Sequence, residues 1–146
     1  MTDYSADEAT LAGHGVRPTA MRLLVLRTLR AAECAVSLAD MERSLDTADR
    51  STLFRTLTLF LEHHIVHQVT DHTGRVMYAL CPPGCLCDVP GGAHTGDHHA
   101  HFTCEACGKT FCLRHQPVPE VKLPDGFTVT AANYTLRGLC PACSRK

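Results

Sequence analysis

Two cysteine pairs near the end of the chain constrain its fold more than any other feature. Cys104-Glu-Ala-Cys107 and Cys140-Pro-Ala-Cys143 are separated by 32 residues. Each pair can place two thiolates on one ion, and two pairs complete the tetrahedral four-cysteine site typical of structural zinc. The separation is longer than in a minimal zinc ribbon, so strands must fill it. We therefore expect Cys104, Cys107, Cys140 and Cys143 to hold a structural Zn²⁺.

A redox dithiol is the alternative interpretation of the second pair, because Cys140-Pro-Ala-Cys143 resembles a thioredoxin-type motif. Activation of the thiolate in such a motif depends on a helix that begins at the motif. Only three residues follow Cys143. We therefore expect no helix at this position, which favours zinc over redox chemistry.

Composition indicates a reducing compartment. The chain has nine Cys and ten His in 146 residues, and it contains no apolar run long enough to cross a membrane. Its first residues, MTDYSADEAT, are acidic and polar, unlike a secretory signal. We therefore expect no membrane partner and a cytoplasmic location, where clustered Cys and His more often bind metal than form disulfides.

The first 64 residues have the apolar periodicity of helices. Three helices are predicted, over residues 20–30, over residues 38–45, and from Asp49 or Ser51 to about His63. Suitable N-cap residues precede the first two, namely Thr19 and Ser37. The third helix carries one apolar stripe, formed by Leu53, Leu57, Phe60 and Leu61.

Beyond residue 64 the pattern changes to that of strands. Residues 64–70 and 75–80 are predicted to pair as a hairpin, with Asp71-His-Thr-Gly74 as its turn. Three helices followed by a hairpin is the plan of the winged helix-turn-helix, whose third helix enters the DNA major groove. We assign residues 1–81 to a winged-helix DNA-binding domain.

The second half of the chain is predicted to be a separate, smaller domain. Residues 82–97 are rich in Pro and Gly and are expected to be a linker. Four strands are predicted beyond it, over residues 99–103, 110–113, 127–130 and 133–137. Three Pro within residues 116–126 argue against a regular helix there. Residues 98–146 thus form an α/β domain, and the fold class of the whole chain is α+β.

Clusters of arginine and of histidine suggest what each half of the chain binds, namely DNA for the first half and a metal ion for the second. The net charge is −1, but residues 17–30 contain Arg17, Arg22, Arg27 and Arg30 and no acid. These arginines are either a local surface for DNA phosphates or solvated charges on a helix face. In the predicted strand after Asp97, His99 and His101 share one face. Two convergent imidazoles suit Zn, Fe or Ni, and a His-rich loop is the alternative.

Together these segments resemble the ferric-uptake-regulator family over nearly the whole chain. Arg17-Pro-Thr-Ala-Met-Arg22 resembles the family's R-x-T-x-x-R entry to its second helix. Ser51-Thr-Leu-Phe-Arg-Thr-Leu57 resembles its A-T-V-Y-R-x-L recognition helix. His98-His-Ala-His-Phe-Thr-Cys-Glu-Ala-Cys-Gly108 resembles its H-H-x-H-x-x-C-x-x-C-G segment, and Gly138-Leu-Cys-Pro-Ala-Cys143 its closing knuckle.

The resemblance implies a metal-gated transcriptional repressor. An N-terminal winged helix would bind DNA, a C-terminal domain would dimerise, and metal at a hinge site would close the dimer onto its operator. The implied DNA contacts are Arg17, Thr19, Arg22, Thr52, Phe54 and Arg55. Phe54 stands where the family has Tyr, so it can offer only apolar contact, for example to a thymine methyl.

Where the chain departs from the common family pattern, its residues resemble those of the zinc-sensing branch. Iron- and peroxide-sensing members carry an acid one residue after the aromatic that closes the wing, but here Ala79 follows Tyr78. The zinc-sensing branch has a Cys three residues after that aromatic and a ligand fourteen residues before that Cys. These positions, with the two strand histidines, give a regulatory site of His67, Cys81, His99 and His101. Thiolate and imidazole ligands favour Zn²⁺ over a hard ion.

Other metal-ligand positions are less regular. Cys112 stands where many members carry an acidic ligand, and it is either an additional regulatory ligand or a small buried hydrophobe. Ala100 and Ala132 stand where members with a third metal site have ligands, so no such site is expected. Cys85 and Cys87 match no family ligand and are either bystanders or an added metal or redox feature.

The sequence thus predicts a zinc-responsive repressor that is not an enzyme. About two Zn²⁺ per chain are expected, with Fe²⁺ as an alternative regulatory ion. The expected partners are a second copy of the chain and double-stranded, palindromic operator DNA, with no small-molecule substrate. The alternatives are an iron- or peroxide-responsive member of the same family, and a zinc-buffering or thiol-redox protein that does not bind DNA.

Overall fold

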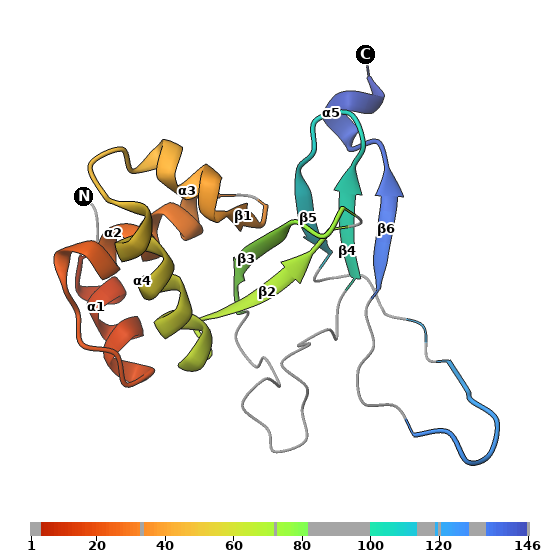
Figure 1. Ribbon diagram of the computed structural model, residues 1–146, viewed down its shortest axis with the longest axis horizontal. Coiled ribbons are helices and arrows are strands. Elements are labelled where there is room, and N and C mark those ends of the chain that lie inside the picture. Colours follow the sequence, from red (N-terminus) through yellow and green to blue (C-terminus); the bar gives the residue numbers. More distant parts are fainter. Residues whose placement is uncertain are drawn as a thin grey trace. The chain divides into compact units, whose positions relative to one another are not determined.

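The chain consists of two compact units, Met1–Pro83 (unit 1) and Gly84–Lys146 (unit 2), in a computed structural model (Figure 1). The structure describes residues 4–32, 34–71, 73–81, 100–113, 119, 121–128 and 134–145. The predicted linker, residues 82–97, lies outside the described residues, as do His98 and His99. Each unit is described below by itself.

The described part of unit 1 contains four helices, three of which the sequence predicted. They are α1 (Tyr4–Gly13), α2 (Ala20–Ala31), α3 (Leu38–Ser44) and α4 (Arg50–Glu62). The N-caps of α2, α3 and α4 are Thr19, Ser37 and Asp49, and each side chain accepts a hydrogen bond from a backbone N–H in the first turn. Asp49 rather than Ser51 therefore begins the third predicted helix.

The first helix was not specifically predicted, and its contacts change the interpretation of the basic segment. In α1 only Asp7 and Leu11 are buried. Asp7 forms ion pairs of 2.8 Å with both Arg27 and Arg30. Two of the four arginines between residues 17 and 30 therefore share one carboxylate within unit 1, whereas Arg17 and Arg22 can face phosphates without this competition.

The core of unit 1 gathers apolar side chains from all four helices and the hairpin. Its fully buried members include Leu11, Val25, Leu26, Met41, Leu53, Leu57 and Phe60. Burying one such side chain stabilises the fold by about 1.5–3 kcal/mol. The predicted apolar stripe of α4 is confirmed at Leu53, Leu57 and Phe60, whereas its fourth member, Leu61, is only partly buried. On α2, Leu24 is 39% exposed and lies outside the core.

A small antiparallel sheet completes unit 1 and confirms the winged-helix plan. Its strands are β1 (Val36–Ser37), β2 (Val66–Thr70) and β3 (Val76–Leu80), in the order β1-β3-β2. The register pairs His67 with Ala79 and Val66 with Leu80. The turn is held by Asp71, which accepts the backbone N–H groups of Thr73 and Arg75 at 2.8 and 3.0 Å. Figure 1 shows β2 leaving directly from the end of α4.

Unit 2 is built on a three-stranded sheet. Its strands are β4 (Ala100–Cys104), β5 (Thr110–Leu113) and β6 (Thr135–Gly138), in the order β5-β4-β6, with β4 antiparallel to β5 and parallel to β6. The strand predicted over residues 127–130 is not observed at Phe127 and Thr128, and its other residues lie outside the described ones. Gly138 lets the Phe102 ring approach the end of β6 closely, since a Cβ there would lie 3.2 Å from Phe102 Cζ.

The chain ends in a short helix, α5 (Pro141–Ser144). The expectation that no helix forms after the second cysteine pair is therefore wrong. Pro141 at the first helical position has a fixed φ that suits a helix start, so one turn forms even with few residues left. Among the described residues, no helix is long and apolar enough to span a membrane.

Candidate metal centres and nucleic-acid interface

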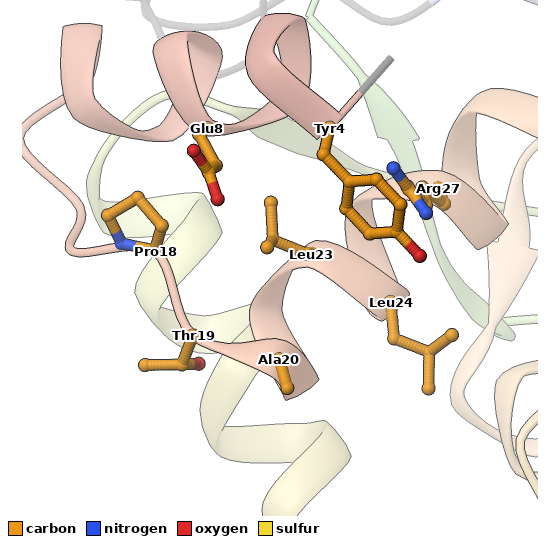
Figure 2. Close-up of a pocket in the computed structure, with 8 residues that line it drawn as sticks. All are labelled: Tyr4, Glu8, Pro18, Thr19, Ala20, Leu23, Leu24 and Arg27. Atoms are coloured by element: carbon orange, nitrogen blue, oxygen red, sulfur yellow. The ribbon is translucent and has the colours of Figure 1, made fainter. Parts of the chain in front are cut away.

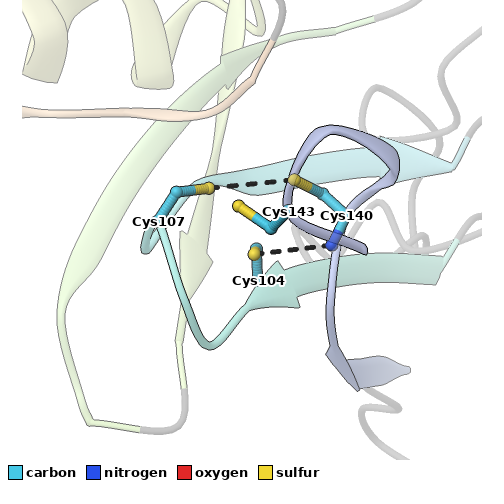
Figure 3. A group of neighbouring side chains, drawn as sticks. All are labelled: Cys104, Cys107, Cys140 and Cys143. Carbon is cyan, nitrogen blue, oxygen red and sulfur yellow. Dashed lines mark hydrogen bonds between the residues drawn. The ribbon is translucent and has the colours of Figure 1, made fainter. Parts of the chain in front are cut away.

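Four cysteine sulfurs converge at one end of the unit 2 sheet (Figure 3). The Sγ atoms of Cys104, Cys107, Cys140 and Cys143 all lie within 4.8 Å of one another, and Cys107 Sγ lies 3.9 Å from Cys140 Sγ. Zn–S bonds of 2.3 Å in a tetrahedron place the sulfurs about 3.8 Å apart. The spacing and chemistry of the cluster therefore fit a structural zinc ion.

Backbone geometry brings the two pairs together. The chain turns between Cys104 and Cys107, and Gly108 follows at φ 75°, a conformation that favours glycine. Glu105 N–H donates to Gly138 O at 2.8 Å, which ties this turn to the end of β6. Cys140, two residues later, is the N-cap of α5, so the turn of that helix carries Cys143 back towards the first pair.

The electrostatics of the cluster suit a cation. Backbone N–H groups, chiefly that of Cys107 and then that of Cys140, lower the pKa of the Cys104 thiol to about 6. The Cys140 N–H donates to Cys104 Sγ at 3.4 Å. The neighbouring thiols of Cys140 and Cys104 raise the pKa of Cys143 to about 12. Four adjacent thiols cannot all ionise without a compensating positive charge, which a divalent metal supplies.

The second cysteine pair meets one requirement of a redox dithiol, because α5 begins there. A helix at such a motif is one requirement for an activated dithiol. Here the helix is a single turn of four residues, and the sulfurs of the other pair share the same space. Convergence of four thiols is the arrangement of a metal site rather than of a two-cysteine redox centre.

In unit 1 the structure brings together two of the predicted regulatory ligands. His67 Nδ1 lies 3.8 Å from Cys81 Sγ. The hairpin register explains this, since His67 pairs with Ala79 and Cys81 is two residues further on, so the two side chains are diagonal neighbours on one face. A zinc ion with Zn–N and Zn–S bonds of about 2.1 and 2.3 Å separates its two ligand atoms by about 3.5 Å. The pair therefore fits two positions of a tetrahedral site.

In unit 2, His101 and Cys112 are directly opposed across the β4–β5 pair. Opposed residues of an antiparallel pair project from the same face, with Cβ atoms about 5 Å apart. The register thus places an imidazole and a thiol next to each other on one face, as a ligand role for Cys112 would require. The fourth predicted ligand, His99, lies outside the described residues.

The predicted DNA contacts before α2 are arranged around its N-terminus. Arg17 and Thr19 are exposed, and Arg22 is half-buried. Thr19 Oγ1 accepts the backbone N–H of Arg22 at 3.3 Å, so its hydroxyl hydrogen is still able to donate to a phosphate oxygen. Arg22 Nη1 donates to Arg17 O at 2.8 Å, which fixes this guanidinium at the helix start.

The predicted contacts on α4 differ in what they can offer. Phe54 is 51% exposed, as an apolar contact to DNA requires, and Arg55 is exposed as well. Arg55 Nε donates to Ser51 O, and its two Nη groups can form a bidentate contact. The Thr52 hydroxyl donates to the N-cap residue Asp49 at 2.6 Å, so Thr52 can accept from a base amino group but cannot donate to phosphate while this bond is made. Hydrogen bonds from Thr52 also hold the pKa of Asp49 below its usual range.

A cleft of about 510 Å³ opens beside this surface, between α1 and the first turns of α2 (Figure 2). It is lined by Tyr4, Glu8, Pro18, Thr19, Ala20, Leu23, Leu24 and Arg27. The guanidinium carbon of Arg27 lies 3.7 Å from the centre of the Tyr4 ring, a cation–π contact. Among the described residues of the lining, Thr19 is the one predicted DNA contact.

Residues 13–124 match the model of the Ferric uptake regulator family. The chain belongs to that family. It is 31% identical over 144 residues to the zinc uptake regulation protein of Escherichia coli (strain K12), which covers 93% of this chain and 78% of that protein. It is 25% identical over 149 residues to the ferric uptake regulation protein of Bordetella parapertussis (strain 12822), which covers 96% of this chain and 98% of that protein.

A solved structure of a zinc uptake regulator complexed with zinc and DNA has the same fold. Its TM-score is 0.60 at 26% identity, covering 97% of this chain and 92% of that chain. Because ferric uptake regulator family members are metal-responsive transcription regulators, this chain is a regulator of that kind and not an enzyme. The relatives of the chain thus include both an iron and a zinc regulator.

Sequence reasoning missed one set of ion pairs next to the predicted DNA contacts. Asp7 forms ion pairs with Arg27 and Arg30. Nothing in the local sequence pattern distinguishes these two arginines from Arg17 and Arg22. The available signal was the helical spacing of Arg27 and Arg30, which places both on one face. Their acidic partner, Asp7, lies 20 residues before Arg27 in the sequence, too far for a local pattern to reveal the pairing.

Proposed function

We propose that this chain is a zinc-sensing repressor that binds operator DNA as a homodimer when its regulatory site is metallated. The observation that carries the choice of zinc is the thiol of Cys81 beside the imidazole of His67, 3.8 Å apart. Thiolate with imidazole is a soft ligand pair that suits Zn²⁺, whereas iron and manganese sites favour carboxylates. The E. coli relative, a zinc uptake regulation protein, supports the same assignment.

Two zinc ions per chain are proposed, with different roles. The cluster of Cys104, Cys107, Cys140 and Cys143 would hold the structural ion. The regulatory ion would take ligands from both units, namely His67 and Cys81 from unit 1 and His99 and His101 from unit 2. Cys112 is proposed as a fifth candidate, because its register position beside His101 gives unit 2 a thiol of its own.

The regulatory ion would act by restricting the two units. Ligands from both units on one ion remove much of the freedom of the connection between them. That restriction selects the spacing of two recognition helices in a dimer that fits half-sites about one DNA turn apart. Arg17, Thr19 and Arg22 would position the protein on phosphates, while Thr52, Phe54 and Arg55 on α4 would reach base edges.

Dimerisation is proposed to use unit 2, because its described surface is rich in exposed apolar side chains. Their exposed fractions are 65% for Val121, 45% for Leu123, 68% for Phe127, 54% for Leu136 and 53% for Leu139. Leu136 lies on β6, which pairs with β4 alone among the described strands, and a strand at the edge of a sheet can favour association. Exposed apolar side chains of this size are typical of surfaces that become buried against a partner.

Metal-dependent DNA binding tests this proposal. A duplex bound by the zinc-loaded protein would be selected from a random-sequence pool, and its dissociation constant measured by anisotropy at buffered free Zn²⁺, Fe²⁺ or Mn²⁺. We expect Zn²⁺ to strengthen binding at the lowest free concentration and the selected duplex to be palindromic. A response to Fe²⁺ alone would identify an iron regulator, and no DNA binding with two bound zinc ions would identify a zinc buffer.

A further inference from the structure

Two histidines join the ends of α1 and α4 in a reciprocal way. His14 Nδ1 lies 3.1 Å from the backbone oxygen of His63, and His63 Nδ1 lies 2.8 Å from the backbone oxygen of His14. A carbonyl oxygen only accepts hydrogen bonds, so each Nδ1 must carry a proton and donate it. Each imidazole therefore satisfies the carbonyl of the other residue, 49 positions away in the sequence.

Both carbonyls belong to chain segments that are leaving a helix. His63 is the C-cap of α4, and His64 follows it at φ 59°. His14 comes directly after α1 and precedes Gly15 at φ 75°. The last carbonyls of a helix have no partner within it, so donors from elsewhere are needed. The imidazoles supply these donors, and the His63 ring packs on Gly15, where a Cβ would lie 3.6 Å from Nδ1.

This pair connects the two segments that are proposed to contact DNA. Arg17 is three residues beyond His14, at the start of the Arg17–Arg22 segment. His63 ends α4, eight residues beyond Arg55, which is about 12 Å along a helix. Apolar side chains of α1 and α4 pack in the core of unit 1. The histidine pair adds two hydrogen bonds nearer the surface, where His14 is exposed and His63 is half-buried.

We propose that His14 and His63 are positioning residues for DNA binding. Their two hydrogen bonds hold the Arg17–Arg22 segment in register with the recognition helix α4. Neither residue belongs to the proposed metal ligands or to the proposed DNA contacts, so their effect on DNA binding is indirect. The inference rests on the proposed DNA-binding function and adds to it the residues that keep the two contact segments aligned.

Substitutions that retain or remove the donor test this role. In His14→Asn and His63→Asn the side-chain amide keeps an N–H donor near the position of Nδ1, whereas His14→Leu and His63→Leu fill similar space without a donor. We expect each Leu variant to weaken binding to the selected duplex about three- to tenfold, and each Asn variant to bind within about twofold of the parent. Zinc content and zinc dependence should not change in any of the four variants.

Equal binding by the Leu variants and the parent would overturn the positioning role. Asn variants as weak as the Leu variants would also overturn it, because the loss would then follow from the ring and not from the donor. Nitrogen-15 NMR of the intact, histidine-labelled protein provides a readout without DNA, and it should show a proton on Nδ1 of both residues. Protonation at Nε2 alone would contradict the hydrogen bonds themselves. If the parent binds no DNA, the proposed function and the positioning role both fail, while the NMR result still decides whether the bonds exist.

Discussion

At the scale of single residues, the cysteine cluster depends on the backbone as well as on its thiols. The two N–H groups that lower the pKa of Cys104 most come from Cys107 and Cys140, one from each pair. The same bonds that stabilise a thiolate therefore also require the two pairs to be in place. The four cysteines could be predicted to converge from their spacing in the sequence. The differences between the pKa values of their thiols depend on backbone contacts that the sequence does not display.

Replacing one ligand of this cluster should cost folding and not merely sensing. Structural zinc contributes on the order of 10–16 kcal/mol to small zinc domains. The described part of unit 2 has only three short strands and one helical turn to replace that energy. We expect Cys104→Ser to lose one zinc per chain and its dimer, as measured by native mass spectrometry and sedimentation. Cys34→Ser, in unit 1, is the matched control and should keep both, and a folded Cys104→Ser dimer that lacks one zinc would refute the structural role.

Asp40 gives a pH-dependent prediction at the same scale. Burial raises the pKa of Asp40, but hydrogen bonds from Ser37 and the charge of Arg75 outweigh it and leave that pKa below its ordinary value of 3.8. A lowered pKa in the folded state means that the ionised carboxylate stabilises the fold above pH 3.8, and that this stability is lost as pH falls through the lowered value.

Denaturant unfolding of the parent and of Asp40→Asn tests this. The side chain is 30% exposed, so solvent screens the interaction and the loss at neutral pH should be about 1 kcal/mol. The difference between the two proteins should shrink as pH falls below about 4. Subtracting the variant removes the effect of acid on the zinc cluster, which both proteins share. A difference that stays constant from pH 7 to pH 3 would show that ionised Asp40 contributes nothing.

At the scale of elements, α4 is the part whose function can be tested most simply. Arg55 and Arg50 lie on the same helix, but Arg50 forms an ion pair with Glu42. We expect Arg55→Ala to weaken binding to the selected duplex by about 1–3 kcal/mol, the range for one base contact, and to leave zinc content unchanged. Arg50→Ala should change binding much less. If anisotropy gives equal losses for both, α4 contributes only general positive charge and does not read the operator.

Elements that repeat a local pattern were predictable, and elements that depend on distant partners were not. The caps Thr19 and Ser37 precede apolar periodicity, so α2 and α3 could be predicted from the sequence. Helix α1 is mostly polar, and its position depends on Asp7 meeting arginines of α2. Strand β1 has only two residues and forms because β3 pairs with it. Helix α5 was not predicted, because it begins at Pro141, within the second cysteine pair, and not after Cys143.

At the scale of the whole molecule, strand periodicity pointed to His99 and His101 as metal ligands, whereas the addition of His67 and Cys81 to the same proposed site came from the family resemblance. The hairpin register explains the fourteen-residue spacing of His67 and Cys81, since hairpin geometry alone makes them diagonal neighbours. No periodicity relates this pair to ligands in unit 2. His99 lies outside the described residues, so its part in the site stays a prediction.

Removing the proposed sensing thiol should separate sensing from folding. We expect Cys81→Ser to keep the four-cysteine zinc and the dimer but to lose most of the zinc-dependent gain in DNA affinity. Deprotonation of this thiol accompanies metal binding, so the zinc affinity of the parent should rise with pH more steeply than that of the variant. Cys112→Ser is the companion variant. If Cys81→Ser responds normally to zinc and Cys112→Ser does not, Cys112 is the sensing thiolate.

The coupling between zinc and DNA is the central claim, and one measurement tests it most directly. The affinity of the second zinc per chain would be measured by competition with a chelator, with and without the selected duplex, while the four-cysteine cluster stays filled. Linkage requires DNA to tighten zinc binding by the same factor by which zinc tightens DNA binding. We predict that this factor is about 5- to 150-fold, the usual range for coupled sites. An affinity for the second zinc that is the same with and without DNA would contradict the account.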